Sequence, residues 1–470
     1  MKPNSKAIFV FIVMGLLLGA GLRAGAENVA SPPDVAPAPL LGLAPTPPMG
    51  WNSYDCYCGD VTEQEVRANA DYLAEHLAPY GWNYVVVDYY WYFPHPRWSE
   101  DQEKWDVSMD EHGRLLPALN RFPSAANGQG FKPLADYVHS KGLKFGIHIM
   151  RGIPRAAVVK NLPIMGTPAH ARDVADTGNA CSWSTAMYGV DVSQPAGQAY
   201  YDSIVALYAQ WGVDFIKADD MSRGNKPAAR EDYHGPEIAA LSRAIQKSGR
   251  PMVLSLSPGA TPLADAAHVM QHAQMWRISD DFWDDWKLIK KQFEYCRAWA
   301  PYIGPDHWPD ADMLPLGRVR IRGFDDPERP SRLTSAEQRT HLTLWVIFRS
   351  PLIMGGDLPS LDAATLALLT NAEVLGVNQH STHNRELFAR GDQVAWAADV
   401  PGSPEKYLAV FNLDDHTPVQ VAVQWSDLGL HGKCSVRDLW GKVEMGVFDG
   451  AFAPEIEPHG AGLYRIKVLP

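Results

Sequence analysis

The amino-acid sequence predicts an α/β fold, a (β/α)₈ TIM barrel followed by a C-terminal antiparallel β-sandwich. A unit of amphipathic helix, glycine and short strand recurs along most of the chain. The strands of this unit are continuously apolar, as in a parallel sheet that is buried on both faces. After about residue 380, turn residues separate short strands, which are expected at 394–398, 407–411, 419–423 and 462–468, and this texture is typical of a sandwich.

The first helix begins with a capping box, because Thr62 precedes Glu65 by three residues. Apolar residues then keep helical spacing up to Gly81, and a strand is expected over 84–87. More such units can be read up to about Leu358, so eight strands closed into a barrel are expected. An open doubly wound sheet is the alternative, but no glycine-rich phosphate loop follows the first strand. The next three units place helices at 131–139, 194–211 and 236–246 and strands at 144–150, 213–218 and 252–256.

The N-terminal residues have the features of a cleavable signal peptide. Lys2 and Lys6 precede an apolar run over 7–22, and small residues at 24–26 form a cleavage site. The run is short for a membrane anchor, which is the alternative. We therefore expect a secreted or periplasmic protein that is cut after Ala26. The expected parts are a signal peptide at 1–26, a Pro/Ala-rich tether at 27–46, the barrel at 47–382 and the sandwich at 383–470.

Charge and cysteine content exclude several classes of protein. A net charge of −12 argues against nucleic acid or an anionic membrane as the partner. Five cysteines allow a disulfide in an oxidising compartment and leave at least one free thiol. Only Cys56 and Cys58 are close in sequence, so a structural zinc site is not expected. The oligomeric state is left open by the sequence.

Acidic and aromatic residues recur where the predicted strands end. Asp88 follows the strand at 84–87, and Asp219 follows the strand at 213–218. In a barrel of this type, these ends form the active site. A single such carboxylate is more often a helix cap, and no regular spacing indicates calcium. Several carboxylates together are what hydrolysis of a glycosidic bond requires, because one carboxylate attacks the anomeric carbon and another transfers a proton.

Five segments, taken in order, carry a family resemblance. They are residues 48–53, the strand end Val87-Asp88, residues 211–217, residues 308–314 and Asn378-Gln379. Together they resemble glycoside hydrolase family 27, the melibiase family of α-galactosidases and α-N-acetylgalactosaminidases, over roughly residues 46–470. The resemblance implies a (β/α)₈ barrel followed by an antiparallel β-domain, and a retaining, double-displacement mechanism.

The resemblance also implies which residues act. The nucleophile falls on Asp219 and the acid/base on Asp281. Because side chains alternate along a strand, Lys217 should lie beside Asp219 and keep it ionised. Such chemistry needs only carboxylates and water, so we expect a carbohydrate partner and no metal or organic cofactor. The substrate-binding residues are expected to be Trp51, Tyr54, Asp88, Tyr89, His148, Lys217, Ser257, Trp276, Arg277 and Asp312.

Departures from the family pattern affect which sugar the site is expected to accept. After the second strand the family usually has Asp-Asp-Cys-Trp, whereas this chain has Asp88-Tyr89-Tyr90-Trp91. The second Asp, which helps to bind hydroxyls on the far side of galactose, is missing. The leading expectation is release of terminal α-D-galactosyl residues. The alternatives are a β-L-arabinopyranosidase, whose sugar is galactopyranose without C6, an α-N-acetylgalactosaminidase, or a sugar-binding protein that has lost catalysis.

Overall fold

The computed structural model describes residues 42–95, 106–181, 183–222, 233–257, 259–322 and 327–469. The predicted signal peptide and most of the predicted tether lie outside these residues. Within the described ranges, no helix has the length and apolar character needed to cross a membrane.

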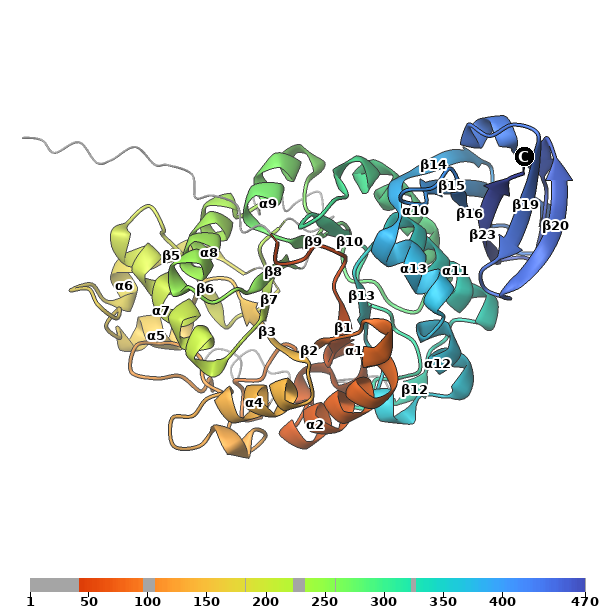
Figure 1. Cartoon of the computed structure of the whole chain (residues 1–470). Coiled ribbons are helices and arrows are strands. Elements are labelled where there is room, and N and C mark those ends of the chain that lie inside the picture. Colours follow the sequence, from red (N-terminus) through yellow and green to blue (C-terminus); the bar gives the residue numbers. More distant parts are fainter. Residues whose placement is uncertain are drawn as a thin grey trace, which may run out of the picture. The chain divides into compact units, whose positions relative to one another are not determined.

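Eight parallel strands form the barrel, and they follow one another around the ring in chain order (Figure 1). A parallel bridge between Leu314, which follows the seventh strand, and Met354 of the eighth closes the ring. The prediction of a (β/α)₈ barrel is therefore confirmed. The strands are β1 (Met49–Asn52), β2 (Tyr84–Val87), β3 (Lys144–Met150), β7 (Phe215–Asp219), β8 (Val253–Leu256), β9 (Met275–Arg277), β10 (Trp308–Asp310) and β13 (Leu352–Met354).

Helices follow the strands as the sequence predicts. The capping box at the start of the first long helix is present, since the backbone N of Thr62 donates to Oε2 of Glu65 over 2.9 Å. The main barrel helices are α1 (Tyr54–Tyr57), α2 (Glu63–Tyr72), α4 (Lys132–Ser140), α7 (Pro195–Trp211), α8 (Gly235–Ser248), α9 (Ala266–His272), α10 (Trp286–Trp299), α11 (Ser335–Phe348), α12 (Ala363–Leu369) and α13 (Ala372–His380).

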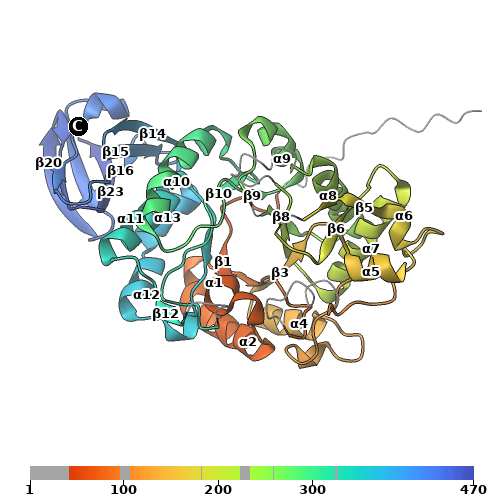
Figure 2. The same cartoon turned by 180° about the vertical axis from the view of Figure 1, so that it is seen from behind.

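A small subdomain is inserted between β3 and α7. Its three strands form an antiparallel sheet in the order β4-β6-β5, next to two short helices (Figure 2). The elements are β4 (Ile153–Pro154), α5 (Arg155–Lys160), α6 (Ala171–Val174), β5 (Ala175–Ala180) and β6 (Met187–Val190). The sequence does not predict this sheet, because β5 has the composition of a loop, Ala-Asp-Thr-Gly-Asn-Ala.

Alternation along the strands separates two hydrophobic layers. Tyr84, Val86 and Phe215 point into the barrel, where they form a cluster with Ala44 and the fully buried Trp308. Ala44 belongs to the predicted tether, yet its backbone N donates to Asp306 over 2.7 Å and its carbonyl accepts from Trp308 Nε1. Residues 42–46 are therefore part of the fold, which corrects the C-terminal limit predicted for the tether.

The C-terminal domain is the predicted antiparallel sandwich. Its core lies between a six-stranded sheet and two small two-stranded sheets. The sequence predicts one strand over 419–423, whereas the structure has two short strands that pair with different partners. The large sheet has the order β14 (Thr382–Arg390), β15 (Gln393–Asp399), β16 (Lys406–Asn412), β23 (Ala461–Val468), β19 (Lys433–Asp438) and β20 (Val443–Asp449), and the small pairs are β17 (Val419–Gln420) with β22 (Glu455–Ile456) and β18 (Val423–Gln424) with β21 (Ala451–Phe452).

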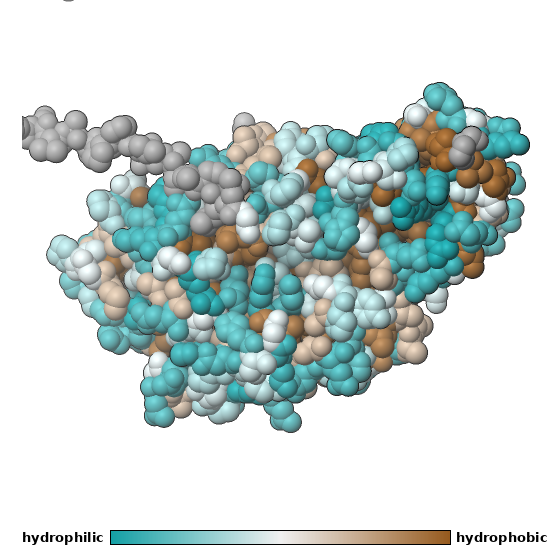
Figure 3. Space-filling view, viewed as in Figure 1, coloured by the Kyte–Doolittle hydropathy of each residue, from teal (hydrophilic) through white to brown (hydrophobic). Residues whose placement is uncertain are grey.

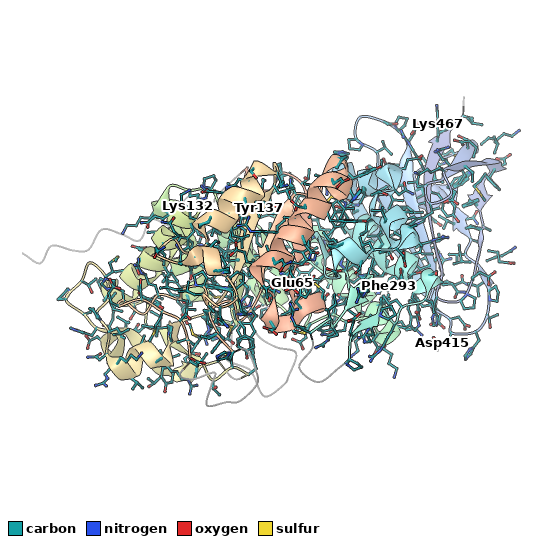
Figure 4. All side chains as sticks on the ribbon, turned by 90° about the horizontal axis from the view of Figure 1, so that it is seen from below. Glu65, Lys132, Tyr137, Phe293, Asp415 and Lys467 are labelled. Carbon is teal, nitrogen blue, oxygen red and sulfur yellow. The ribbon has the colours of Figure 1, made fainter. Side chains whose placement is uncertain are left out.

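Contacts between side chains join this sheet to the barrel. Phe293 of α10 packs edge-to-face on Phe411 of β16, with ring centroids 4.9 Å apart (Figure 4). Nearby, Asp415 accepts a hydrogen bond of 3.0 Å from Lys290. The visible surface is mainly hydrophilic, with a hydrophobic area on the C-terminal domain (Figure 3).

Four of the five cysteines, Cys56, Cys181, Cys296 and Cys434, are buried free thiols. No disulfide therefore links these four, although the count allows one. Because apolar burial disfavours the thiolate, the pKa of each of these thiols is raised above its ordinary value.

Candidate active site

Asp219 is the last residue of β7, and both of its carboxylate oxygens are held. Oδ1 accepts from the backbone N of Asp220 over 2.5 Å, and Oδ2 lies 2.8 Å from Nε2 of His148, two residues before the end of β3. The side chain is only 10% exposed. Burial raises the pKa of Asp219, whereas His148 and Lys217 lower it and the negative charge of Asp281 raises it further. Asp219 thus has the position and support of a buried nucleophile.

Lys217 forms its ion pair with Asp88, at the end of the strand two places away in the ring. Its Nζ lies 2.8 Å from Oδ2 of Asp88, which also accepts a 2.6 Å hydrogen bond from Asn52. Burial opposes ionisation of Asp88, but the ammonium of Lys217 holds the pKa of that carboxyl below its ordinary value. The sequence predicts Lys217 beside Asp219. The structure instead pairs it with Asp88, while its charge still lowers the pKa of Asp219.

Arg277, the last residue of β9, organises the other side of the site. Its Nη2 lies 2.8 Å from Oδ2 of Asp312 and 3.3 Å from Oδ1 of Asp281. Arg277 and Asp312 are buried, whereas the side chain of Asp281 is 61% exposed. An acid/base must reach both a leaving group and water, so the exposed Asp281 suits that role and the buried Asp219 suits nucleophilic attack.

Aromatic rings flank both carboxylates. On one side Tyr89 lies 5.1 Å from the ring of His148, which contacts Asp219. On the other side, burial raises the pKa of Tyr54, and the negative charges of the nearby Asp281 and Asp88 raise it further. The ring of Trp283 is 6.5 Å from Tyr54 and covers the guanidinium of Arg320 at 3.8 Å. Trp283 is not among the predicted residues, although its place two residues after Asp281 is a signal that could have found it.

Trp51 and Trp276 do not join this site, which corrects two predicted substrate contacts. Trp51 is fully buried and donates from Nε1 to the Gly356 carbonyl over 2.9 Å. Trp276 is fully buried against Trp299 of α10, with centroids 5.8 Å apart. Each directly precedes a residue that faces into the barrel, Asn52 and Arg277, and strand alternation therefore turns both indoles toward the helices.

Ser257 and three polar residues that the sequence does not predict complete the site. Ser257 is buried one residue after β8, and its backbone N donates to the Ala218 carbonyl beside Asp219. Asn52 and Asp310 lie within the family-like segments at 48–53 and 308–314 and could have been found there. Asp55 carries no such signal. Burial, with the charge of Asp312, raises the pKa of the Asp55 and Asp310 carboxyls, to about 6 for Asp310.

Two family models match most of the chain. The model described as alpha galactosidase A matches residues 46–160 and 187–380, and the alpha galactosidase C-terminal beta sandwich domain matches residues 390–466. The chain belongs to glycoside hydrolase family 27. It is therefore a glycosidase, and retention of anomeric configuration is characteristic of family 27. Residues 161–186, within the inserted subdomain, lie outside both matches.

Solved and curated relatives agree with this assignment. A GH27 β-L-arabinopyranosidase from Geobacillus stearothermophilus, solved in complex with arabinose, is 49% identical, with a TM-score of 0.88 over 91% of this chain and 98% of that chain. An α-galactosidase from Cyamopsis tetragonoloba is 28% identical over 90% of this chain and 86% of its own length. An α-galactosidase A from Cellvibrio japonicus is 29% identical over 72% of this chain and 68% of its own length.

Replacing His148 by Phe tests its hydrogen bond to Asp219. We expect kcat/KM to fall about 10- to 100-fold, the cost of one hydrogen bond to a charged group. Because His148 lowers the pKa of Asp219, its removal should raise that pKa. The nucleophile must be ionised, so the acid limb of the pH profile of kcat/KM should move to higher pH.

His139 provides the control, because it makes a similar 2.7 Å contact with Asp214 just before β7, at the opposite end of the strand from Asp219. His139→Phe should leave the acid limb in place. An unmoved limb in the His148→Phe variant would exclude the proposed influence of His148 on Asp219.

Proposed function

We propose that this glycosidase removes terminal β-L-arabinopyranosyl residues from oligosaccharides or glycans, with retention. Asp219 attacks the anomeric carbon while Asp281 donates a proton to the leaving oxygen. The bond to the leaving group breaks and a glycosyl ester forms on Asp219. Asp281 then takes a proton from water, which attacks the anomeric carbon and frees Asp219.

The observation that carries the choice of sugar is the placement of Tyr89. This ring stands where the family usually has its second Asp, and it is 3% exposed. It is held by contacts with His148 and Trp183, and its hydroxyl donates to Ser184 Oγ over 3.1 Å. A carboxylate that would bind galactose hydroxyls is replaced by a fixed ring. A sugar that lacks the C6 hydroxymethyl group needs fewer hydrogen bonds from this part of the site than galactose does.

The similarities give separate support. Identity to the Geobacillus β-L-arabinopyranosidase is 49%, compared with 28% to the Cyamopsis α-galactosidase. Release of α-D-galactosyl residues is the second candidate, and the names of the curated relatives favour it.

Parallel assays decide between the sugars. β-L-arabinopyranoside, α-D-galactoside and α-N-acetylgalactosaminide substrates with one common leaving group are compared by kcat/KM. We expect the arabinoside to be preferred by about 10-fold or more, the range that one pocket contact can discriminate. A preference for the galactoside would reject this proposal in favour of the second candidate.

Tyr89→Asp restores the carboxylate and should shift the ratio of kcat/KM values toward the galactoside by about 10-fold or more. Tyr89→Phe keeps the ring and serves as the control, with an expected preference like that of the wild type. An unchanged ratio in the Tyr89→Asp variant would show that Tyr89 does not select the sugar.

We also propose export through a signal peptide that is removed after Ala26. The positive, apolar and small-residue regions in order support this proposal. N-terminal sequencing of protein recovered outside the cytoplasm should begin at Glu27, and a mature chain that still begins at Met1 would contradict it.

A further inference from the structure

The inserted subdomain brings an exposed tryptophan to the neighbourhood of the nucleophile. Residues 161–186, which the family models do not match, contain α6 and β5 and then Trp183. Trp183 is 38% exposed, whereas most large apolar side chains of the described residues are buried. An aromatic ring that is partly exposed can pack against a bound molecule.

The segment that carries Trp183 is bonded to the ends of the barrel strands. Tyr89, just after β2, donates its hydroxyl to Ser184. Arg151, just after β3, donates to the Asn179 carbonyl over 3.3 Å. Burial raises the pKa of Asp220, which follows the nucleophile, and the nearby thiol of Cys181 lowers it. These contacts lie on both sides of Trp183 in the sequence and fix the position of its backbone.

The ring of Trp183 lies two aromatic contacts from Asp219. Trp183 packs edge-to-face with Tyr89 at 5.6 Å between centroids, and Tyr89 lies 5.1 Å from His148, which contacts Asp219. Exposure rises along this chain of contacts, from 0% at His148 and 3% at Tyr89 to 38% at Trp183. Trp183 therefore stands at the solvent end of a wall that begins at the nucleophile.

We propose that Trp183 forms a binding site for the leaving group, on which a sugar attached to the scissile bond stacks. The proposal rests on the glycosidase function proposed above and specifies its substrates: glycosides whose leaving group is itself a saccharide. A sugar ring has an apolar C–H face that packs on an indole, and the buried Tyr89 is left to contact the sugar that is released.

Two substrates with the same released sugar separate this role from catalysis. One is the glycosyl fluoride, which has no leaving-group sugar, and the other is a disaccharide. In Trp183→Ala, kcat/KM for the disaccharide should fall about 10- to 100-fold, because a large apolar contact is lost. Hydrolysis of the fluoride should stay within about threefold of the wild type, since the carboxylates are untouched and Tyr89 keeps its contact with His148 and its hydrogen bond to Ser184.

Two further variants make the result decisive. Met165→Ala removes a side chain of matched exposure, 39%, from the same segment and should change neither substrate. Trp183→Phe keeps an aromatic face and should recover most of the disaccharide activity. Equal losses on both substrates in Trp183→Phe, or unchanged disaccharide hydrolysis in Trp183→Ala, would overturn the proposal.

A failure of the proposed L-arabinopyranosyl specificity can be distinguished from a failure of the proposed leaving-group site at Trp183. The fluoride and disaccharide pair is prepared in the L-arabinopyranosyl and the D-galactosyl series. The wild-type enzyme shows which series is cleaved, and the effect of Trp183 is measured within that series. Cleavage of galactosides alone would reject the arabinopyranosidase proposal, and the role of Trp183 would still be tested with the galactosyl pair.

Discussion

The Asp219→Asn variant is expected to lose about 10⁴-fold or more in kcat on any glycoside, the scale seen when a nucleophile is removed. An amide cannot form the glycosyl ester, although it keeps the size of the carboxylate. Its carbonyl can still accept from the backbone N of Asp220, which lies 2.5 Å from Oδ1. The thermal unfolding midpoint should therefore remain close to that of the wild type while turnover is lost.

Azide tests whether the carboxylate of Asp219 is the nucleophile. In Asp219→Gly, azide can enter the space of the carboxylate and attack the anomeric carbon directly. One displacement inverts the configuration, so NMR of the product should show a glycosyl azide of inverted configuration. Near-normal hydrolysis by Asp219→Asn, or no effect of azide on Asp219→Gly, would mean that another residue attacks the sugar.

The second large effect is expected at Asp281, and it should depend on the leaving group. Asp281→Asn removes the proton donor, so cleavage of a sugar–sugar bond should fall about 10²- to 10⁴-fold. A fluoride or dinitrophenolate leaves without a proton, and formation of the glycosyl ester from such substrates should fall less than about 10-fold. Pre-steady-state release of the leaving group measures this first step directly.

In Asp281→Asn, azide should give a product of the opposite configuration to the one expected from Asp219→Gly. The glycosyl ester on Asp219 still forms, and azide needs no general base to attack it. Two displacements restore the original configuration, so the product should be a glycosyl azide of retained configuration. Asp280→Asn, at the exposed neighbouring position, is the control and should keep normal turnover. Equal losses for good and poor leaving groups in Asp281→Asn would contradict an acid/base role.

The periodicity of the sequence was enough to predict the barrel, because helix and strand patterns are local. The strands at 84–87 and 144–150 have the same limits in the structure as in the prediction, and the capping box at Thr62 starts its helix. The sequence does not predict β14, β19 or β20 in the C-terminal sheet. β14 and β20 are its edge strands, and an edge strand is open to solvent, so β20 lacks the buried alternation that marks a strand.

The chemistry of the site was readable from residue types at the strand ends, but the direction of each side chain was not. Both indoles predicted to bind sugar, Trp51 and Trp276, face the helices, because the residue after each one faces the barrel interior. Lys217 pairs with Asp88, since the ring brings together residues 129 positions apart in the chain. Only packing between distant segments decides such partners.

The sequence by itself determined the barrel, the following sandwich and the set of carboxylates from which the catalytic pair is proposed. The tertiary structure decided what surrounds them. It placed His148 on Asp219 and Arg277 between Asp281 and Asp312, and it carried Trp183 to the ring of Tyr89. Local patterns follow from the backbone and from hydrophobic period, whereas these contacts depend on how strands and an inserted segment meet in space.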